Sequence, residues 1–346
     1  MIAERYKLGS LEKMSDKHDE RNFQFSKLQT DAPPATFMDA VNFLDSIRAR
    51  KIAQAYGDCT SFGGKRCKDW SEKKVMSAHF LYHAIKEISG RYDDEGDYPI
   101  NAHKALCTVG ICEEAYHPTV PDMTWQQYAK REPSAAAIEN ALMHKSRTYW
   151  EVQRGTLEEF KRAMGIFQTP VNIAMEVYTS YLSCPADGHL PLPSGSMEGG
   201  HSLSGEGYES VTGQFYAGRI WLGNSWGENW GLKGRAWIPF EEFGAHNFTS
   251  CFVNLDIDKN MIYKINRESG EQFLIEENLK IALNISNVAM LQKLQGRGLK
   301  EEPMDISEAE LSGYLICPLT DRDSVSEIIK SHYNGLADVI GVNRLK

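Results

Sequence analysis

Long apolar runs are missing from this sequence, and so is an amino-terminal stretch of the kind that directs secretion. No run of about 18 apolar residues, the length that spans a bilayer as a helix, occurs among the 346 residues. The first residues, Met1 to Lys7, are charged and contain no apolar h-region, which argues against a Sec-type signal peptide. We therefore expect no membrane segment and a cytoplasmic or virion-associated location.

Cysteine pairs and metal-ligand spacings are also absent. The cysteine count is odd and no CxxC pair occurs; the seven positions are Cys59, Cys67, Cys107, Cys112, Cys184, Cys251 and Cys317. This usage indicates a reduced intracellular protein with mostly buried thiols. His79 and His83 have the spacing of helix neighbours, but no HExxH glutamate or third ligand accompanies them. We therefore expect neither a metal nor a cofactor.

Positive charge is in short supply. Lys and Arg number 38 against 47 Asp and Glu, which gives a formal net charge of -9. A nucleic acid is therefore not expected as a partner, because phosphate binding favours a cationic surface. The one local basic run, Lys65-Arg66-Cys67-Lys68 with Lys73-Lys74, is interpreted as a solvated face.

Apolar periodicity and turn residues predict the order of helices and strands. Helices are expected over 37–50, 71–89, 99–110, 135–143 and 157–164, with Gly90 and Gly165 ending the second and the last. Strands are expected over 170–178, 201–208, 215–223 and 234–239. A mainly helical part followed by a mainly antiparallel part is an α+β pattern, and the apolar content of 42% suffices for a core.

The composition changes at both ends of the chain. Residues 1–32 are polar and highly charged, and they are interpreted as an arm. After about residue 258 the pattern predicts a helix over 276–293, a loop over 295–305, a strand over 311–319 and a helix over 324–333. We therefore expect an arm (1–32), a main domain (33–257) and a small α/β appendage (258–346) that is a candidate for contacts in a larger assembly.

Cys59 is the first residue with a chemically distinctive setting. Gly57 permits a tight turn and Asp58 is a plausible N-cap, which places Cys59 in the first turn of a helix. Free backbone N–H groups and the helix dipole stabilise a thiolate there. Gly63-Gly64 are poor helix residues, so this helix is expected to be short or bent.

A histidine and an asparagine provide the second distinctive setting. His201 lies among glycines at the start of an expected strand, and Asn224 lies in Asn224-Ser225-Trp226-Gly227. An imidazole that transfers protons needs a group that fixes its tautomer and ring angle. An Asn side chain can do this through its amide oxygen.

These motifs together resemble the papain-like cysteine peptidases, and more closely their bacterial and phage-type branch. The resemblance depends on the Asn224-Ser225-Trp226-Gly227 block with Trp230-Gly231, on Gly200-His201 followed by Gly207-Tyr208, and on the turn around Cys59. It covers roughly 31 to 257 and keeps the order Cys, His, Asn.

The resemblance implies a two-lobed fold, with a helical lobe that carries Cys59 and a β-rich lobe that carries His201 and Asn224. By this resemblance Cys59 is the nucleophile, His201 the base, Asn224 the group that orients His201, and Gln54 an oxyanion donor. The implied reaction is thiol-dependent hydrolysis of a peptide or protein bound in the cleft between the lobes. We expect the 1–32 arm to lie across or beside that cleft, or to be removed.

Two other functions remain open on the sequence. One is a catalytically weakened scaffold, or a structural or binding protein of a virion, in which residues 258–346 carry the function. The other is a transamidase that uses the same three residues with an acyl acceptor other than water.

Overall fold

The computed structural model describes most of the chain in two compact units. The described residues are 6–11, 40–43, 53–146, 148–152, 156–167, 169–210, 216–255, 261–276, 281–285, 304–312 and 315–319. The first unit extends to Asn254, and the second begins at Leu255.

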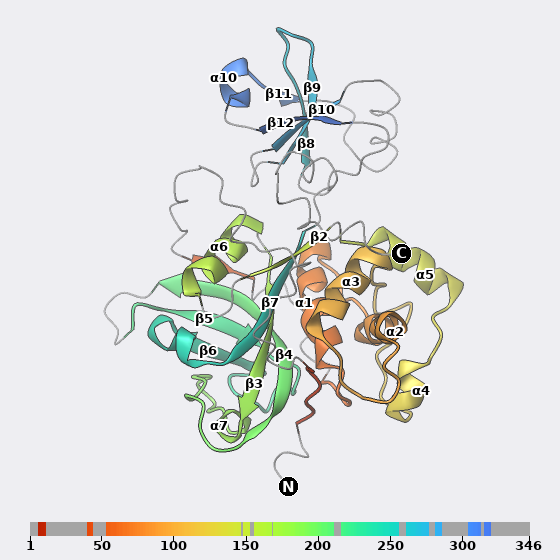
Figure 1. Ribbon diagram of the computed structural model, residues 1–346, viewed down its shortest axis with the longest axis vertical. Coiled ribbons are helices and arrows are strands. Elements are labelled where there is room, and N and C mark those ends of the chain that lie inside the picture. Colours follow the sequence, from red (N-terminus) through yellow and green to blue (C-terminus); the bar gives the residue numbers. More distant parts are fainter. Residues whose placement is uncertain are drawn as a thin grey trace. The chain divides into compact units, whose positions relative to one another are not determined.

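Five helices form the first half of the larger unit (Figure 1). They are α1 (Cys59–Glu72), α2 (Ala78–Ser89), α3 (Pro99–Thr108), α4 (Trp125–Ala129) and α5 (Ala135–Met143). The predicted helix over 71–89 is wrong at its start, because Lys73 adopts a left-handed conformation with φ 56° and ends α1. Ser77 then caps α2 by accepting a hydrogen bond from the Phe80 N–H, and the predicted end at Gly90 is confirmed.

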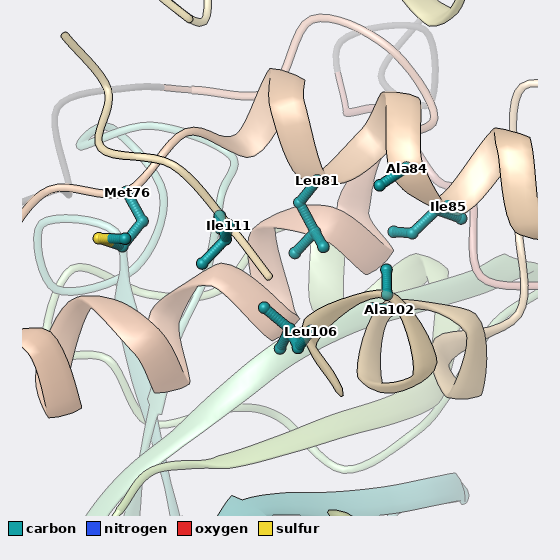
Figure 2. Close-up of a cluster of buried hydrophobic side chains, with 8 residues drawn as sticks. Met76, Leu81, Ala84, Ile85, Ala102, Leu106 and Ile111 are labelled. Carbon is teal, nitrogen blue, oxygen red and sulfur yellow. The ribbon is translucent and has the colours of Figure 1, made fainter. Parts of the chain in front are cut away.

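The core of this helical half lies between α2 and α3. Leu81, Ala84 and Ile85 of α2 point toward Ala102 and Leu106 of α3 (Figure 2). Met76 and Ile111 close one end of the cluster, and every member is almost completely buried. This apolar contact fixes α2 and α3 as a pair against which α1 packs.

Helix α1 continues through its two glycines, so the expectation that it is short is wrong. It spans 14 residues. A Cβ atom built on Gly63 would lie 2.3 Å from Asn172 Oδ1 and 2.5 Å from Ser202 Oγ, whereas one on Gly64 would lie 3.1 Å from the Ala102 side chain. The two glycines therefore let α1 approach the sheet on one side and α3 on the other.

A seven-stranded sheet forms the second half of the larger unit. Its strands are β2 (Thr148–Glu151), β7 (Phe248–Leu255), β3 (Val171–Tyr178), β4 (Met197–Ser210), β5 (Gly218–Gly223) and β6 (Arg235–Pro239) in spatial order, with β1 (Ala40–Asn42) also paired to β4. The pairs from β7 through β6 are antiparallel. The α+β class is confirmed. The predicted helix over 37–50 is wrong at 40–42, where the chain pairs with β4 as a strand.

Further helices border this sheet: α6 (Leu157–Phe167), α7 (Thr179–Leu182) and the 3-10 helix η4 (Phe240–Ala245). The predicted end of α6 at Gly165 is wrong, because the helix continues to Phe167.

The second unit is built on a five-stranded sheet in the order β11-β8-β9-β10-β12. Its elements are β8 (Met261–Ile265), β9 (Gln272–Glu276), β10 (Ile281–Ile285), β11 (Met304–Asp305), α10 (Glu308–Leu311) and β12 (Leu315–Leu319). The predicted helix over 276–293 is wrong at 281–285, where the alternating apolar residues pair with a strand on each side. The strand predicted over 311–319 begins at Leu315, and the helix predicted over 324–333 lies outside the described residues.

The expectation of a solvated basic face on α1 is wrong. Lys65 pairs with Asp69 at 2.6 Å, and Lys68 pairs with Glu72 at 2.8 Å, all four side chains being almost fully buried. Arg66 is buried as well. Since α1 lies between the sheet and the other helices, most of its cations have no route to solvent. Lys74, beyond the helix, is exposed beside Glu113.

The histidine pair on α2 is packed rather than arranged for a metal. His79 Nε2 lies 2.7 Å from the Tyr128 carbonyl oxygen, and His83 Nδ1 lies 3.0 Å from that of Ala129. Across the described ranges, no group of three or more His, Cys, Asp or Glu residues is placed to hold a metal ion. No helix in that same part of the chain is long and apolar enough to cross a membrane.

Candidate active site

Cys59 is the first residue of α1, so the prediction that it lies in the first helical turn is confirmed. Its side chain is fully buried. Burial raises the pKa of the thiol to about 12, opposed by backbone contacts with Ser202, Gly9 and Thr60. The contact with Ser202 matters most for chemistry, because the residue before it in β4 is His201.

His201 and Asn224 are joined by a hydrogen bond between His201 Nε2 and Asn224 Oδ1 of 2.8 Å. The same oxygen accepts the Ser225 N–H at 2.7 Å. This second bond identifies the oxygen end of the amide, so Nε2 of the neutral ring carries the proton and Nδ1 carries the lone pair. His201 Nδ1 is buried and has no hydrogen-bond partner among the described residues.

Two tryptophans cover the His201–Asn224 contact. Trp226 stacks on the imidazole with ring centroids 4.5 Å apart, and Trp230 meets Trp226 edge-on at 5.4 Å. Their rings exclude water from a hydrogen bond that is stronger in a low dielectric. Burial lowers the pKa of His201 to about 4, opposed by the bond to Asn224.

Gln54 reaches the same corner of the site from the segment before α1. Its backbone N–H donates to the Ser225 carbonyl at 2.9 Å, and its Oε1 accepts the Ser225 hydroxyl. Its Nε2 donates to the carbonyl oxygens of Lys7 at 3.0 Å and Tyr56 at 2.9 Å. The side-chain N–H group is therefore oriented by its neighbours and already binds a carbonyl oxygen.

The described part of the amino-terminal arm, residues 6–11, lies across these residues. The N–H groups of Gly9 and Ser10 both donate to the Gly200 carbonyl, at 3.1 and 3.0 Å. The Lys7 carbonyl accepts the Trp226 indole N–H at 3.0 Å in addition to Gln54 Nε2. The described residues of the arm therefore contact the candidate site, whereas residues 12–32 lie outside the described part of the chain.

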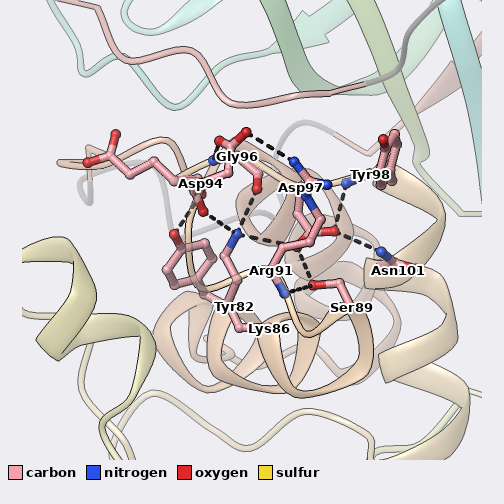
Figure 3. A network of polar contacts seen from close by, with 10 residues as sticks. Tyr82, Lys86, Ser89, Arg91, Asp94, Gly96, Asp97, Tyr98 and Asn101 are labelled. Carbon is pink, nitrogen blue, oxygen red and sulfur yellow. Dashed lines mark hydrogen bonds and ion pairs between the residues drawn. The ribbon is translucent and has the colours of Figure 1, made fainter.

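On its other side the arm pairs with the backbone of Asp97, which lies in the loop between α2 and α3. The Asp97 N–H donates to the Gly9 carbonyl at 2.8 Å, and the Leu11 N–H donates to the Asp97 carbonyl at 3.1 Å. Figure 3 shows how side chains hold the loop: buried Lys86 donates to the Gly96 carbonyl at 2.6 Å and lies 3.3 Å from the Asp97 carboxylate. Asn101 donates to the same carboxylate at 2.7 Å.

Burial favours the uncharged forms of Cys59 and His201 around neutral pH. With the thiol pKa raised and the imidazole pKa lowered by burial, both groups are uncharged near pH 7. A thiolate–imidazolium pair needs solvent or substrate dipoles that the buried form lacks. The neighbouring Asp58 carboxyl is also buried, and burial raises its pKa to about 7.

Comparison with known proteins shows the family to which this chain belongs. The family model for the papain family cysteine proteases matches residues 61–252, more than half of the chain. The chain belongs to the papain family of cysteine proteases. The matched region begins two residues after Cys59 and includes His201 and Asn224.

Individual relatives are distant. A curated relative, an uncharacterized peptidase C1-like protein of Acanthamoeba polyphaga mimivirus, is 23% identical over 222 residues; the match covers 60% of this chain and 66% of that protein, just under two thirds of its length. Xylellain, a cysteine protease from Xylella fastidiosa, superposes with a TM-score of 0.58 at 21% identity, covering 72% of this chain and 96% of xylellain. Digestive procathepsin L 3 of Tenebrio molitor gives a TM-score of 0.52 at 15% identity, over 73% of this chain and 77% of that one. These similarities show the papain-like fold.

Several residues that shape the site have no role that the sequence alone predicts. Gly200 supplies the carbonyl that holds the arm, and Gly9 fits against the Gly57 backbone because it has no side chain. Arg66 and Glu206 lie beneath Asn224. The signal for Gly200 was present, since paired glycines before a functional histidine indicate close backbone approach.

Proposed function

We propose that this protein hydrolyses peptide bonds, with Cys59 as nucleophile, His201 as base and Asn224 as the residue that orients the imidazole. The observation that carries the proposal is the His201 Nε2–Asn224 Oδ1 bond of 2.8 Å. That bond leaves the lone pair of Nδ1 for the thiol. Family membership supports the same assignment.

In the proposed reaction, the proton of the Cys59 thiol passes to His201 Nδ1 as the sulfur attacks the substrate carbonyl carbon. Gln54 Nε2 donates to the oxyanion that forms. The C–N bond then breaks, the imidazolium protonates the leaving amine, and an acyl thioester remains on Cys59. Water attacks the thioester, passes a proton to His201 and thence to sulfur, and releases the carboxylic acid product.

The arm is proposed to hold the enzyme in a covered form. The donor of Gln54 is taken by the Lys7 carbonyl, and the Gly200 carbonyl is taken by two arm N–H groups. A peptide substrate must displace the arm to make these contacts. Withdrawal of the arm also exposes Cys59 and His201 to water, which favours the charged pair.

A matched pair of cysteine variants tests the nucleophile. We expect Cys59→Ser to abolish hydrolysis of a mixed peptide pool, and Cys67→Ser, in the same helix, to retain it. The assay is mass spectrometry of the pool, with arm-displaced protein obtained from the Gly9 variant described below. Hydrolysis that survives in Cys59→Ser contradicts the assignment.

The same assay separates the other two functions. A transamidase transfers the acyl group to added primary amines in preference to water, so amide products would dominate the spectrum. A scaffold gives no product and no labelling of Cys59 by a thiol-reactive epoxide in any form of the protein.

A further inference from the structure

A buried ion pair lies directly beneath Asn224 and joins the helix that carries Cys59 to the strands that carry His201. Arg66 of α1 and Glu206 of β4 approach to 2.5 Å, with side chains 5% and 0% exposed. The second terminal nitrogen of Arg66 donates to the Asn224 carbonyl oxygen at 2.7 Å. Both bonds of the guanidinium fork are thus made in the interior.

Glu206 reaches this position because β4 contains a bulge. In the pairing with β5, Gly205 faces Leu222 and Gly207 faces Trp221, so Glu206 is an extra residue without a partner position. A bulge of this kind redirects a side chain, and here it sends a carboxylate into the space under Asn224. The Ser204 hydroxyl donates to Glu206 Oε1 at 3.1 Å, and Arg235 Nε lies 3.4 Å from Oε2.

Gly223, the residue before Asn224, completes the arrangement. A Cβ atom at this position would lie 1.8 Å from Glu206 Oε1 and 2.7 Å from the Arg66 guanidinium. The strand therefore passes over the ion pair with no side chain between them, and the Asn224 backbone is set directly on the guanidinium.

A buried ion pair is not in itself a source of stability, because desolvation offsets most of its attraction. Its geometry can nevertheless impose position. We propose that Arg66 and Glu206 are positioning residues that fix the Asn224 backbone. The backbone in turn fixes the side-chain amide of Asn224 and, through it, the His201 tautomer. The inference rests on the proposed function, since it assigns the pair a role in the same site.

The test is the protonation pattern of His201 in the full-length protein, read from ¹⁵N-histidine NMR, with His201→Ala to assign the signal. In the wild type we expect a single Nε2–H tautomer at pH 7. In Arg66→Met, which loses both bonds of the fork, we expect a mixture of tautomers. Lys65→Met is the matched control, because Lys65 is equally buried on α1 but pairs with Asp69; it is expected to keep the wild-type signal.

Arg66→Lys keeps the charge beside Glu206 but lacks the planar fork, and it serves if Arg66→Met does not fold. We expect a partial shift toward the tautomer mixture. In peptide hydrolysis, kcat should fall by about 10- to 100-fold in the arginine variants, as expected when a catalytic group is misplaced. KM should change by less than about twofold.

The two failures are distinguishable. If the arm-displaced protein with Arg66 intact shows no hydrolysis but the tautomer responds as described, the proposed function is wrong and the positioning role stands. If folded Arg66→Lys and Arg66→Met both keep a pure Nε2–H tautomer, the positioning role is refuted whatever the activity.

Discussion

Replacing Gly9 by alanine tests whether the arm controls access to Cys59. A Cβ atom on Gly9 would lie 1.8 Å from the Gly57 carbonyl oxygen and 2.4 Å from its carbon. These are backbone atoms at the turn before α1, so no side-chain rotation relieves the overlap. The arm must move away, or the turn that carries Cys59 must distort.

The size of the effect follows from the contacts around Gly9. Three backbone hydrogen bonds join Gly9 and Ser10 to Gly200 and Asp97. At about 0.5–1.5 kcal/mol for each bond, losing them weakens the covered form by about 1.5–4.5 kcal/mol. Since about 1.4 kcal/mol is a factor of ten in an equilibrium constant, the uncovered fraction should rise by roughly 10- to 1000-fold.

The assay is the rate at which iodoacetamide labels Cys59, measured by peptide mass mapping at pH 7.5. Gly244→Ala is the control, because a Cβ atom at Gly244 meets nothing within 4 Å. Cys107 and Cys184 are partly exposed and serve as reporters of general unfolding. If the protein unfolds as a whole, their labelling rates rise together with that of Cys59. Equal Cys59 rates in the two variants, with Cys107 and Cys184 unchanged, would refute the control of access by the arm.

Three further changes test the surroundings of the site. Because burial raises the pKa of Asp58 to about 7 from an ordinary 3.8, the stability that its protonated form contributes is lost as pH rises through that range. Thermal unfolding should show the free energy of unfolding of Asp58→Asn gaining about 2.7 kcal/mol on that of the wild type from pH 5 to pH 8, because about two pH units of this window lie below the folded pKa. Gly63→Ala should destabilise the fold by at least about 1–3 kcal/mol in urea unfolding and Gly64→Ala by less, an order that reverses if α1 is not pressed against the sheet. Lys86→Met should cost about 3–5 kcal/mol by leaving Asp97 buried without its cation, and a change below 1 kcal/mol in the same urea experiment would contradict that reading.

The elements that the sequence predicts well are those whose local signals agree with their surroundings. Ala135–Met143 is predicted with its observed bounds, and the strand 171–178 has both the alternation and the partners that it needs. The sequence pattern is insufficient where tertiary contacts determine the secondary structure. The apolar pattern of 281–285 is compatible with a helix or a strand, and pairing with two neighbouring strands makes it a strand.

The residues of the site also differ in whether the sequence alone predicts them. His201 and Asn224 can be predicted as a pair because the chemistry requires an orienting group for the imidazole, and the structure brings them together. The charged residues of α1 could not be predicted as buried, because a run such as Lys65-Arg66-Cys67-Lys68 is ordinary on a surface. Only the double glycine, which lets α1 lie against the sheet and α3, shows in hindsight that this helix is enclosed.

The arm and the site that it covers belong to one chain, and this has a consequence for how the covered form responds to concentration. A segment tethered to its own binding site acts at an effective concentration on the order of mM, and dilution does not lower it. A peptide added from outside therefore competes against a fixed effective concentration of the arm. A single cut of the chain between the arm and Cys59 turns the same contacts into an ordinary bimolecular complex, which dissociates on dilution.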